Sequence, residues 1–291
     1  MNKFAKLSIL IGLCLICISI LVSAFDFRNI FSPLFNETSY DKKEYIVDSK
    51  SITKIIIDTE DDNIKIVPYT GEYIKITYNE SENSKYSIKE KNEVITLDKK
   101  SKLCFLCLDF NFKSQEIIVE VPEYLEIVYD VENDNGKIEV SGVKLLDSVF
   151  KTSNGKINVK NLEVKNSLVL KTSNGKVDLK NVTATNVDIK TSNGTINLVN
   201  VNSHKIIAKT SNSKIEFDNL VGTIIDFKTS NGKIDGTIIG DYNDYQKKIK
   251  TSNDKIKING VVNNKVDDKN DGSPKKLTLK TSNGKVNIDF K

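Results

Sequence analysis

The chain has very little of the chemistry that metal centres and disulfide-rich domains require. Its 291 residues include no tryptophan, one histidine and only four cysteines. Cys14 and Cys17 lie in an apolar N-terminal run, so Cys104 and Cys107 are the only cysteines of the remaining chain, too few for a disulfide framework. A zinc site at the CFLC pair would need two further ligands, and His204 is far away in the sequence.

The CFLC pair could also be redox-active, because closely spaced cysteines often are. That chemistry favours a helix N-terminus, whereas LCFLCLDFNF has the composition of a strand, in which residues i and i+3 face opposite sides. We therefore interpret Cys104 and Cys107 as two unpaired or locally buried thiols.

The N-terminus has the features of a targeting segment. Lys3 and Lys6 precede an apolar run from residue 7 to 24, which ends in the signal-peptidase-like sequence Val22-Ser23-Ala24. The run is long enough to span a bilayer, so residues 1–24 are either a cleaved signal peptide or a retained membrane anchor. Residues 25–44 are predicted to be a stalk. We expect an exported protein at the cell membrane, facing away from the cytoplasm, or a secreted cell-surface protein.

A seven-residue phrase recurs through the second half of the chain. Copies of KTSNGKI or a close variant begin at Lys151, Lys171, Lys190, Lys209, Lys228, Lys250 and Lys280, and a degenerate copy, ENDNGKI, begins at Glu132. Successive copies are 19, 20, 19, 19, 19, 22 and 30 residues apart. A period held so closely indicates stacked structural units.

Each repeat has the pattern of two short strands around a turn. In the copy at Lys171, the apolar residues Leu168, Leu170, Val177 and Leu179 alternate with polar ones. Gly175 fits a turn position with a positive φ angle. The repeat has neither the length nor the periodicity of a helix, and it can bury its apolar side only by stacking on its neighbours. A meander of hairpins is the alternative, but hairpins need no constant period.

We therefore predict an all-β fold, a parallel β-solenoid of 19–20-residue coils over residues 132–291. Equivalent asparagines should stack as a ladder of side-chain amides, with the alternative that they only favour left-handed turn geometry. The ladder residues are Asn154, Asn174, Asn193, Asn212, Asn231, Asn253 and Asn283.

The flanking regions differ from the array. Residues 45–131 are rich in strand patterns but irregular, and TEDDNIKIVP looks like a worn repeat, so this region is predicted to contain first coils and an N-terminal cap. The polar run VVNNKVDDKNDGSPKK before the last repeat is predicted to be an insertion that leaves the coil as a loop. No cap is apparent after the last repeat.

The array is basic, with 27 lysines against 18 acidic residues from Glu132 onward. Lysines flank the turn of each repeat, and stacked lysines repel one another unless solvent or a ligand screens them. An anionic polymer could neutralise one such column, whose members are Lys151, Lys171, Lys190, Lys209, Lys228, Lys250 and Lys280. The alternative is that these lysines keep strand edges soluble. Aromatic residues are too few to predict specific nucleic-acid binding.

One stretch carries a family resemblance. The sequence IIVEVPEYLEIVYDVENDNGKIEV, followed by the KTSNGKI array, resembles the bacterial putative-adhesin family of β-strand-repeat cell-envelope proteins, a domain of unknown function. The resemblance covers the chain from about Ile55 to its end. It implies a solenoid, an exported location and a place among proteins with relatives in envelope-stress operons of Gram-positive bacteria. It supplies no catalytic residues.

No catalytic pattern stands out. Asp178, Glu216 and Asp235 share one repeat position, but Asn158, Asn197, Lys257 and Asn287 occupy it elsewhere, and the array contains no arginine. We predict a protein without enzymatic activity, catalytic residues, metal or cofactor, which binds anionic envelope or extracellular polymers. The alternatives are a structural protein that associates with itself through an uncapped end, or an envelope-stress component that acts through a protein partner.

Overall fold

The structure is a computed structural model that describes residues 39–82, 84–101, 115–268 and 272–291. The chain divides into two units, and the second, Asp41–Ser101 with Ser114–Lys291, holds all the described residues except 39 and 40. All described strands belong to the second unit. The expected signal or anchor segment, most of the expected stalk, and Cys104 and Cys107 lie outside the described residues. Among the residues described, no helix has the length and apolar character needed to cross a bilayer.

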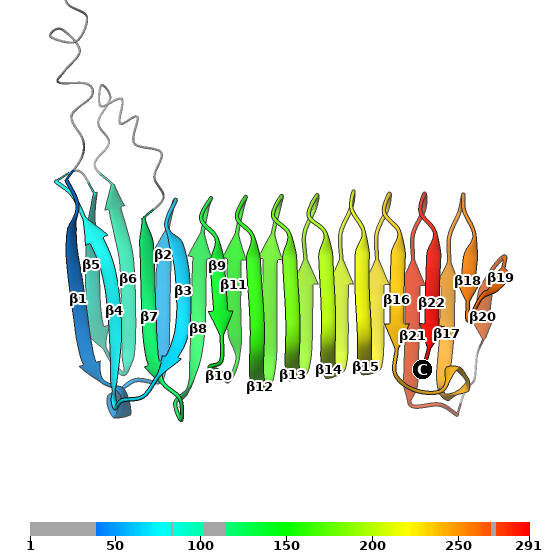
Figure 1. Ribbon diagram of the computed structural model, residues 1–291, viewed down its shortest axis with the longest axis horizontal. Coiled ribbons are helices and arrows are strands. Elements are labelled where there is room, and N and C mark those ends of the chain that lie inside the picture. Colours follow the sequence, from blue (N-terminus) through cyan, green and yellow to red (C-terminus); the bar gives the residue numbers. More distant parts are fainter. Residues whose placement is uncertain (1–38, 83, 102–114, 269–271) are drawn as a thin grey trace, which may run out of the picture. The chain divides into compact units, whose positions relative to one another are not determined.

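The second unit contains β-strands and two single turns of 3-10 helix (Figure 1). Before the array lie β1 Asp41–Asp48, β2 Lys54–Thr59, β3 Asn63–Tyr69, β4 Tyr73–Glu80, β5 Ser84–Lys91, β6 Val94–Ser101 and β7 Glu116–Pro122. The array begins with β8 Glu126–Asn133, β9 Ile138–Ser141, β10 Lys144–Leu145, β11 Ser148–Thr152, β12 Ile157–Thr172, β13 Val177–Lys190, β14 Ile196–Lys209 and β15 Ile215–Lys228. It ends with β16 Ile234–Ile238, β17 Tyr245–Lys250, β18 Ile256–Ile258, β19 Val261–Asn263, β20 Val266–Asp268, β21 Lys275–Lys280 and β22 Val286–Phe290. The 3-10 turns are η2 Ser49–Ser51 and η3 Tyr242–Asp244.

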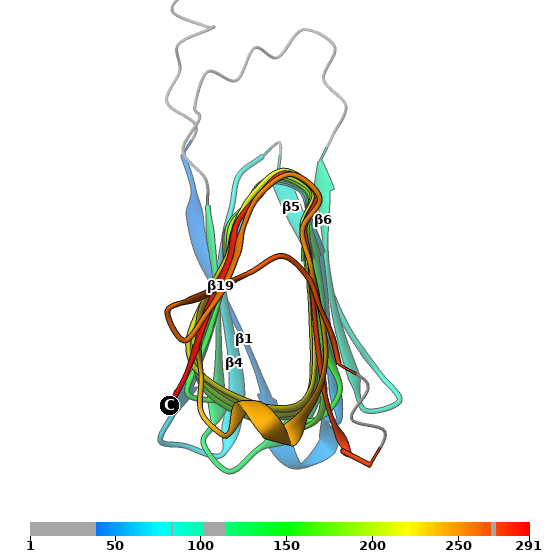
Figure 2. The same ribbon diagram turned by 90° about the vertical axis from the view of Figure 1, so that its right-hand side faces the viewer.

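The repeats stack in parallel register, as the period predicts. Val177 of β13 lies beside Ile196 of β14, which lies beside Ile215 of β15, and the pairing continues to the far ends of these strands. Seen along the stack, successive coils superimpose as a flattened outline with strands on two opposite sides (Figure 2). The all-β, parallel solenoid fold is thus confirmed, and a meander of hairpins is excluded for the array.

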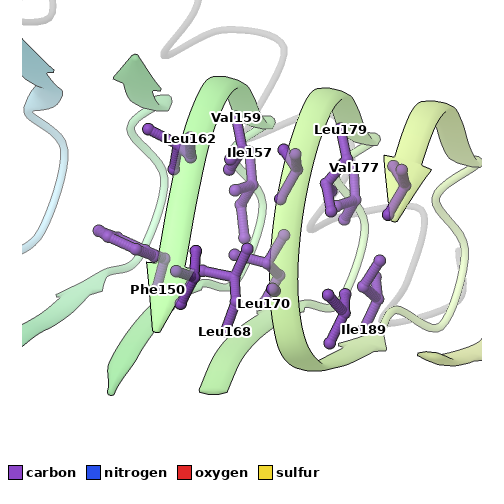
Figure 3. Close-up of a cluster of buried hydrophobic side chains, with 14 of the residues drawn as sticks. Phe150, Ile157, Val159, Leu162, Leu168, Leu170, Val177, Leu179 and Ile189 are labelled. Carbon is purple, nitrogen blue, oxygen red and sulfur yellow. The ribbon is translucent and has the colours of Figure 1, made fainter. Parts of the chain in front are cut away.

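The core runs along the inside of the coils. Leu168, Leu170, Val177 and Leu179 are completely buried, because period-two alternation sends every second side chain inward. Figure 3 shows these residues with their neighbours in adjacent coils, in the space between the two strand layers. The core continues without a break into the region before the array, where Ile55, Ile57 and Leu97 are equally buried.

The glycine of the phrase serves a different purpose from the one expected. Gly175 is not among the residues with positive φ. Instead, a Cβ atom added there would lie 1.7 Å from the carbonyl oxygen of Gly155 in the preceding coil. Gly194 approaches Gly175 equally closely. Glycine suits this turn because the stacked backbones approach closely, although Ser213 and Asp254 occupy the equivalent position in two coils. The prediction of a positive φ angle at Gly175 was wrong.

The asparagine ladder is present. Each side-chain amide donates to the Oδ1 atom of the asparagine in the preceding rung, with N–O distances of 2.6–2.8 Å. The order of the rungs is Asn135, Asn154, Asn174, Asn193, Asn212, Asn231, Asn283 and Asn253. None of these residues has a positive φ angle, so left-handed turn geometry does not explain them.

Left-handed geometry occurs in a second asparagine column that the sequence analysis missed. Its members have φ angles of 52–54°, and each long strand changes direction at this residue. They are Asn161, Asn181, Asn200 and Asn219. Asparagine tolerates this conformation better than most residues. Their amides also form a ladder, with N–O distances of 2.8–3.1 Å.

The last repeats do not stack in sequence order. Strands β21 and β22 of the final repeat pair with β15 and β16 on one side and with β17 and β18 on the other. The C-terminal coil therefore lies between the coils that begin at Lys228 and Lys250. The segment before Lys280 is thus no simple loop, which corrects the prediction of an insertion outside the coil.

That segment closes the end of the stack. Strand β20 pairs antiparallel with β17, and β19 pairs antiparallel with β18. In the same coil, Lys247 points inward and is almost fully buried, with its Nζ 2.8 Å from the carbonyl oxygen of Tyr245. Reversed strands and an inward charge both oppose further parallel stacking. The expectation of an uncapped C-terminal end was therefore wrong.

The opposite end has the same arrangement. The coil of β2 and β3 lies between the coil of β8 and β9 and the coil of β6 and β7. Strands β5 and β4 then pair antiparallel with β6 and β7, and β1 pairs antiparallel with β4. The expected boundary between residues 131 and 132 falls inside β8, and strands on both sides of it belong to one stack.

Candidate functional site

The lysine that opens each phrase occupies one continuous column. We call one side of the stack the entry face; it is formed by the residues that immediately precede each phrase turn. The opposite side, formed by the residues that immediately follow each turn, is the exit face. Each long strand from β12 to β15 begins on the exit face and ends on the entry face. Backbone register aligns the entry lysine column in the order Lys151, Lys171, Lys190, Lys209, Lys228, Lys280 and Lys250. All seven predicted positions are therefore brought together, with the last two in reversed sequence order.

Most of the entry column lacks counter-charges. Lys151 pairs with Glu132 at 3.2 Å, and Lys228 pairs with Asp226 at 2.7 Å. The other five lysines of the column form no ion pair with any residue that the structure describes. Lys171, Lys190, Lys209 and Lys250 are exposed to solvent. Their ammonium groups remain available to an anionic ligand.

The exit lysine column is different, because carboxylates accompany it. This column contains Lys156, Lys176, Lys214, Lys233, Lys285 and Lys255. Asp178 forms ion pairs with Lys156 at 2.8 Å and with Lys176 at 2.6 Å. Glu216 forms ion pairs with Lys214 at 2.7 Å and with Lys233 at 3.1 Å. Lys233 also forms an ion pair with Asp235. Two columns that look equivalent in the sequence therefore differ in the share of lysines that form ion pairs.

The carboxylates of the exit face are ordered rather than scattered. Asn158 donates to Glu139, Asn197 to Asp178, and Asn287 to Asp235, each across one rung. Burial alone raises the pKa of Asp178, but the hydrogen bonds from Lys156 and Lys176 outweigh it and hold the pKa below its ordinary value. Burial and the bonds from Asn287 and Lys233 act on Asp235 in the same way, with a lowered pKa as the result.

The turn edge itself presents further hydrogen-bonding groups. Between the two lysine columns, Ser173 and Asn174 and their equivalents in neighbouring coils are exposed. Threonines one position earlier are buried: the Thr172 hydroxyl accepts from the Gly175 N–H at 3.0 Å and faces the carbonyl oxygen of Gly155 at 3.2 Å. The threonines fix the turn, while the lysines, serines and asparagines form its surface. We call this surface the turn ridge.

A shallow groove of about 390 Å³ interrupts the exit face beside β15, β16 and β22. It forms where Gly236 takes an inward position and the Phe217 ring of the preceding coil fills the space that a side chain would use. Its walls include Glu216, Asp218 and Asp235, which are already bonded to lysines or to the Thr237 hydroxyl. In the described part of the chain, no group of His, Cys, Asp and Glu side chains is suited to holding a metal ion.

Comparison with solved structures finds similar proteins of distant sequence. A "putative adhesin" from Bacteroides fragilis is 15% identical, with a TM-score of 0.51, over 88% of this chain and 98% of the other. A "putative cell adhesion protein" from Clostridium sporogenes is 15% identical, with a TM-score of 0.34, over 87% of this chain and 100% of the other. A "putative lipid binding protein" from Parabacteroides distasonis is 15% identical, with a TM-score of 0.42, over 87% of this chain and 97% of the other.

No functionally curated protein matches this sequence. The pattern of one domain family matches residues 52–289, which run from β2 into β22 and leave out β1. The resemblance noted from the IIVEVP segment and the repeats is thereby confirmed, and the chain belongs to the Toastrack DUF4097 family.

Proposed function

We propose that this protein is a non-enzymatic binding module of the cell surface, which holds an anionic polymer along its entry lysine column. The observation that carries the proposal is the contrast between the two columns. Five of the seven entry lysines have no counter-charge among the described residues, whereas four of the six exit lysines pair with Asp178, Glu216 or Asp235. If lysines served only to keep strand edges soluble, this difference between the two columns would have no explanation.

The spacing of the column suits a polymer better than a small ligand. Neighbouring strands lie about 4.8 Å apart, which is less than the Debye length of about 8 Å at physiological ionic strength. Adjacent ammonium groups therefore repel one another, and a ligand that contacts several at once relieves that repulsion. Phosphodiester polymers of the envelope, anionic glycans and anionic lipid headgroups share this chemistry.

One feature of the exit face favours binding over catalysis. The carboxylates of the exit face have lowered pKa values, whereas a general acid needs a raised one. The names of the adhesins with the same fold, and the expected export segment, favour a surface location. A protein partner is the competing reading, since relatives are expected in envelope-stress systems.

The test compares two matched variants by binding to linear polyphosphate at several salt concentrations. The first replaces the unpaired entry lysines Lys171, Lys190, Lys209, Lys250 and Lys280 with glutamine. The second replaces five exit lysines, Lys156, Lys176, Lys214, Lys233 and Lys285, with glutamine. Both lose the same charge, so general electrostatics predicts equal effects.

We expect the entry variant to lose most of its affinity and its salt dependence. The slope of log K against log salt should fall by about 0.7 for each lysine that contacts a phosphate. The exit variant should bind nearly as the unmodified protein does. Equal weakening by both variants contradicts the assignment to the entry column, and absence of salt-dependent binding by the unmodified protein contradicts polyanion binding altogether.

A further inference from the structure

The entry column continues beyond its lysines into the N-terminal coils, and there its charge reverses. Lys151 lies beside Glu132, Glu132 beside Asp58, and Asp58 beside Asp98. One straight column therefore carries three carboxylates followed by seven ammonium groups. The sign changes at the ion pair between Lys151 and Glu132, whose charged atoms are 3.2 Å apart.

The carboxylate end is crowded with like charge. Burial raises the pKa of Asp58, and the charges of Glu132, Asp98, Asp134 and Glu60 raise it further. Among the described residues, the ion pair from Lys151 to Glu132 is the only one that a lysine forms with the three carboxylates of the column. A polyanion that reaches this end of the turn ridge meets repulsion within one Debye length.

The other end of the column is also defined. Lys250 belongs to β17, which is the last parallel strand on the entry face, and the next strand outward is the antiparallel β20. The lysine column thus has seven rungs and six intervals, about 29 Å at the usual strand spacing of about 4.8 Å. Repulsion closes it on one side, and the cap closes it on the other.

We propose that the turn ridge is a binding site of bounded length for a flexible linear polyanion, and that Asp58, Asp98 and Glu132 set its N-terminal limit. This inference rests on the proposed function and adds to it the length that the site accepts. A chain long enough to span the seven lysines gains all available contacts. A longer chain gains no further contact and must direct its excess away from the acidic coils.

The experiment measures the affinity of the full protein for polyphosphate fractions of increasing chain length at constant salt. We expect affinity per chain to rise until the chain spans about 30 Å, given the strand spacing, and then to level off. The triple variant Asp58→Asn, Asp98→Asn, Glu132→Gln should bind long chains at least about fivefold more tightly, because three exposed repulsions are removed. Its plateau should move to longer chains.

A second triple variant controls for net charge. Glu123→Gln, Glu126→Gln and Glu163→Gln remove three exposed carboxylates near the opposite edge of the coils. This control should keep the plateau of the unmodified protein. If affinity rises without a plateau, or if both triple variants shift the plateau equally, the bounded site is wrong while polyanion binding stands. If no fraction binds, both proposals fail.

Discussion

The side-chain amide of Asn253 donates to Oδ1 of Asn283 at 2.6 Å, although Asn283 belongs to the final repeat, 30 residues later. Asn283 in turn donates to Asn231 at 2.7 Å. The final repeat is therefore held on both sides by repeats that precede it in the sequence. The buried threonines agree, since Thr281 bonds to the Gly232 carbonyl and Thr251 to the Gly284 carbonyl.

Deletion of residues 275–291 should destabilise the end of the stack. The deleted strands contain Leu277, Leu279, Val286 and Ile288, each at most 1% exposed. Burial of one such side chain contributes on the order of 1.5–3 kcal/mol, so the melting temperature should fall clearly. Limited proteolysis should then cut within residues 239–268. A truncated chain with unchanged melting temperature and protease resistance would contradict the interior position of the last coil.

A complementary experiment leaves the coil in place. A protease site is inserted beside the exposed Gly272, so that cleavage of the folded protein separates the last coil covalently from the rest. Because hydrogen bonds and apolar contacts hold that coil on two sides, the released peptide should stay bound during gel filtration in native buffer. Loss of the peptide under native conditions would favour a coil at the end of the stack.

Substitution of Gly175 by alanine should cost about 2–3 kcal/mol of unfolding free energy, within the range for overpacking. The added Cβ would lie 1.7 Å from the Gly155 carbonyl oxygen, so the two coils must separate. Gly272→Ala is the matched control, since nothing lies within 4 Å of a Cβ at that position. Urea unfolding measures both. Equal unfolding free energies of the two variants would mean that the close backbone approach does not affect stability.

Substitution of Thr191 by valine should cost about 1–3 kcal/mol, because it leaves buried polar groups without partners. The Thr191 hydroxyl accepts from the Gly194 N–H at 3.0 Å and lies 3.3 Å from the carbonyl oxygen of Ser173. Thr183→Val makes the same chemical change at an exposed position and should be nearly neutral. Thermal denaturation of the pair checks the difference, and a neutral Thr191 variant would show that the hydroxyl does not stabilise the turn.

Stability should depend on pH through Asp178. Its folded-state pKa is lowered, because the bonds from Lys156 and Lys176 outweigh burial. A carboxyl group of this kind stabilises the fold above its unfolded pKa of about 3.9, and the contribution is lost as pH falls through the folded value. The unmodified protein should therefore lose more stability between about pH 4 and pH 2 than Asp178→Asn does. Parallel melting curves against pH would argue against the two lysine bonds.

Asp58 should affect the pH dependence of stability in the opposite direction. Burial and neighbouring carboxylates raise its folded-state pKa, so its ionised form destabilises the fold. Asp58→Asn should raise the melting temperature at pH 7, and the gain should shrink as pH falls and the native carboxyl becomes protonated. A loss of stability at neutral pH would show that the Asp58 carboxylate makes favourable contacts instead.

The repeat period was enough to predict the parallel stack, its inward alternation and the Asn154–Asn283 ladder, because each follows from local pattern and constant register. The order of the coils was not predictable in the same way. The copies at Lys250 and Lys280 carry almost the same phrase, so either could follow the copy at Lys228. Asp254, which stands where the copy at Lys280 has Gly284, does not separate them, because Ser213 replaces the same glycine in an interior coil.

The candidate site shows a similar division. The sequence places all seven entry lysines in one column, but it gives equal weight to the exit column. The difference arises from residues such as Asp178 and Glu216, which lie two positions after exit lysines and across a rung from others. Register turns these spaced acids into neighbours of two lysines each. The acidic continuation through Glu132, Asp58 and Asp98 depends on the reordered N-terminal coils and has no counterpart in the repeat pattern.

The interior position of the C-terminal coil also bears on how the chain is made. Synthesis proceeds from the N-terminus, so the coil of β17 and β18 leaves the ribosome before β21 and β22 exist. During that interval its proper neighbour is missing, and β15 and β16 offer an edge that it can occupy only temporarily. The stack can be completed only after β21 and β22 have been made, so assembly of this end cannot be strictly vectorial.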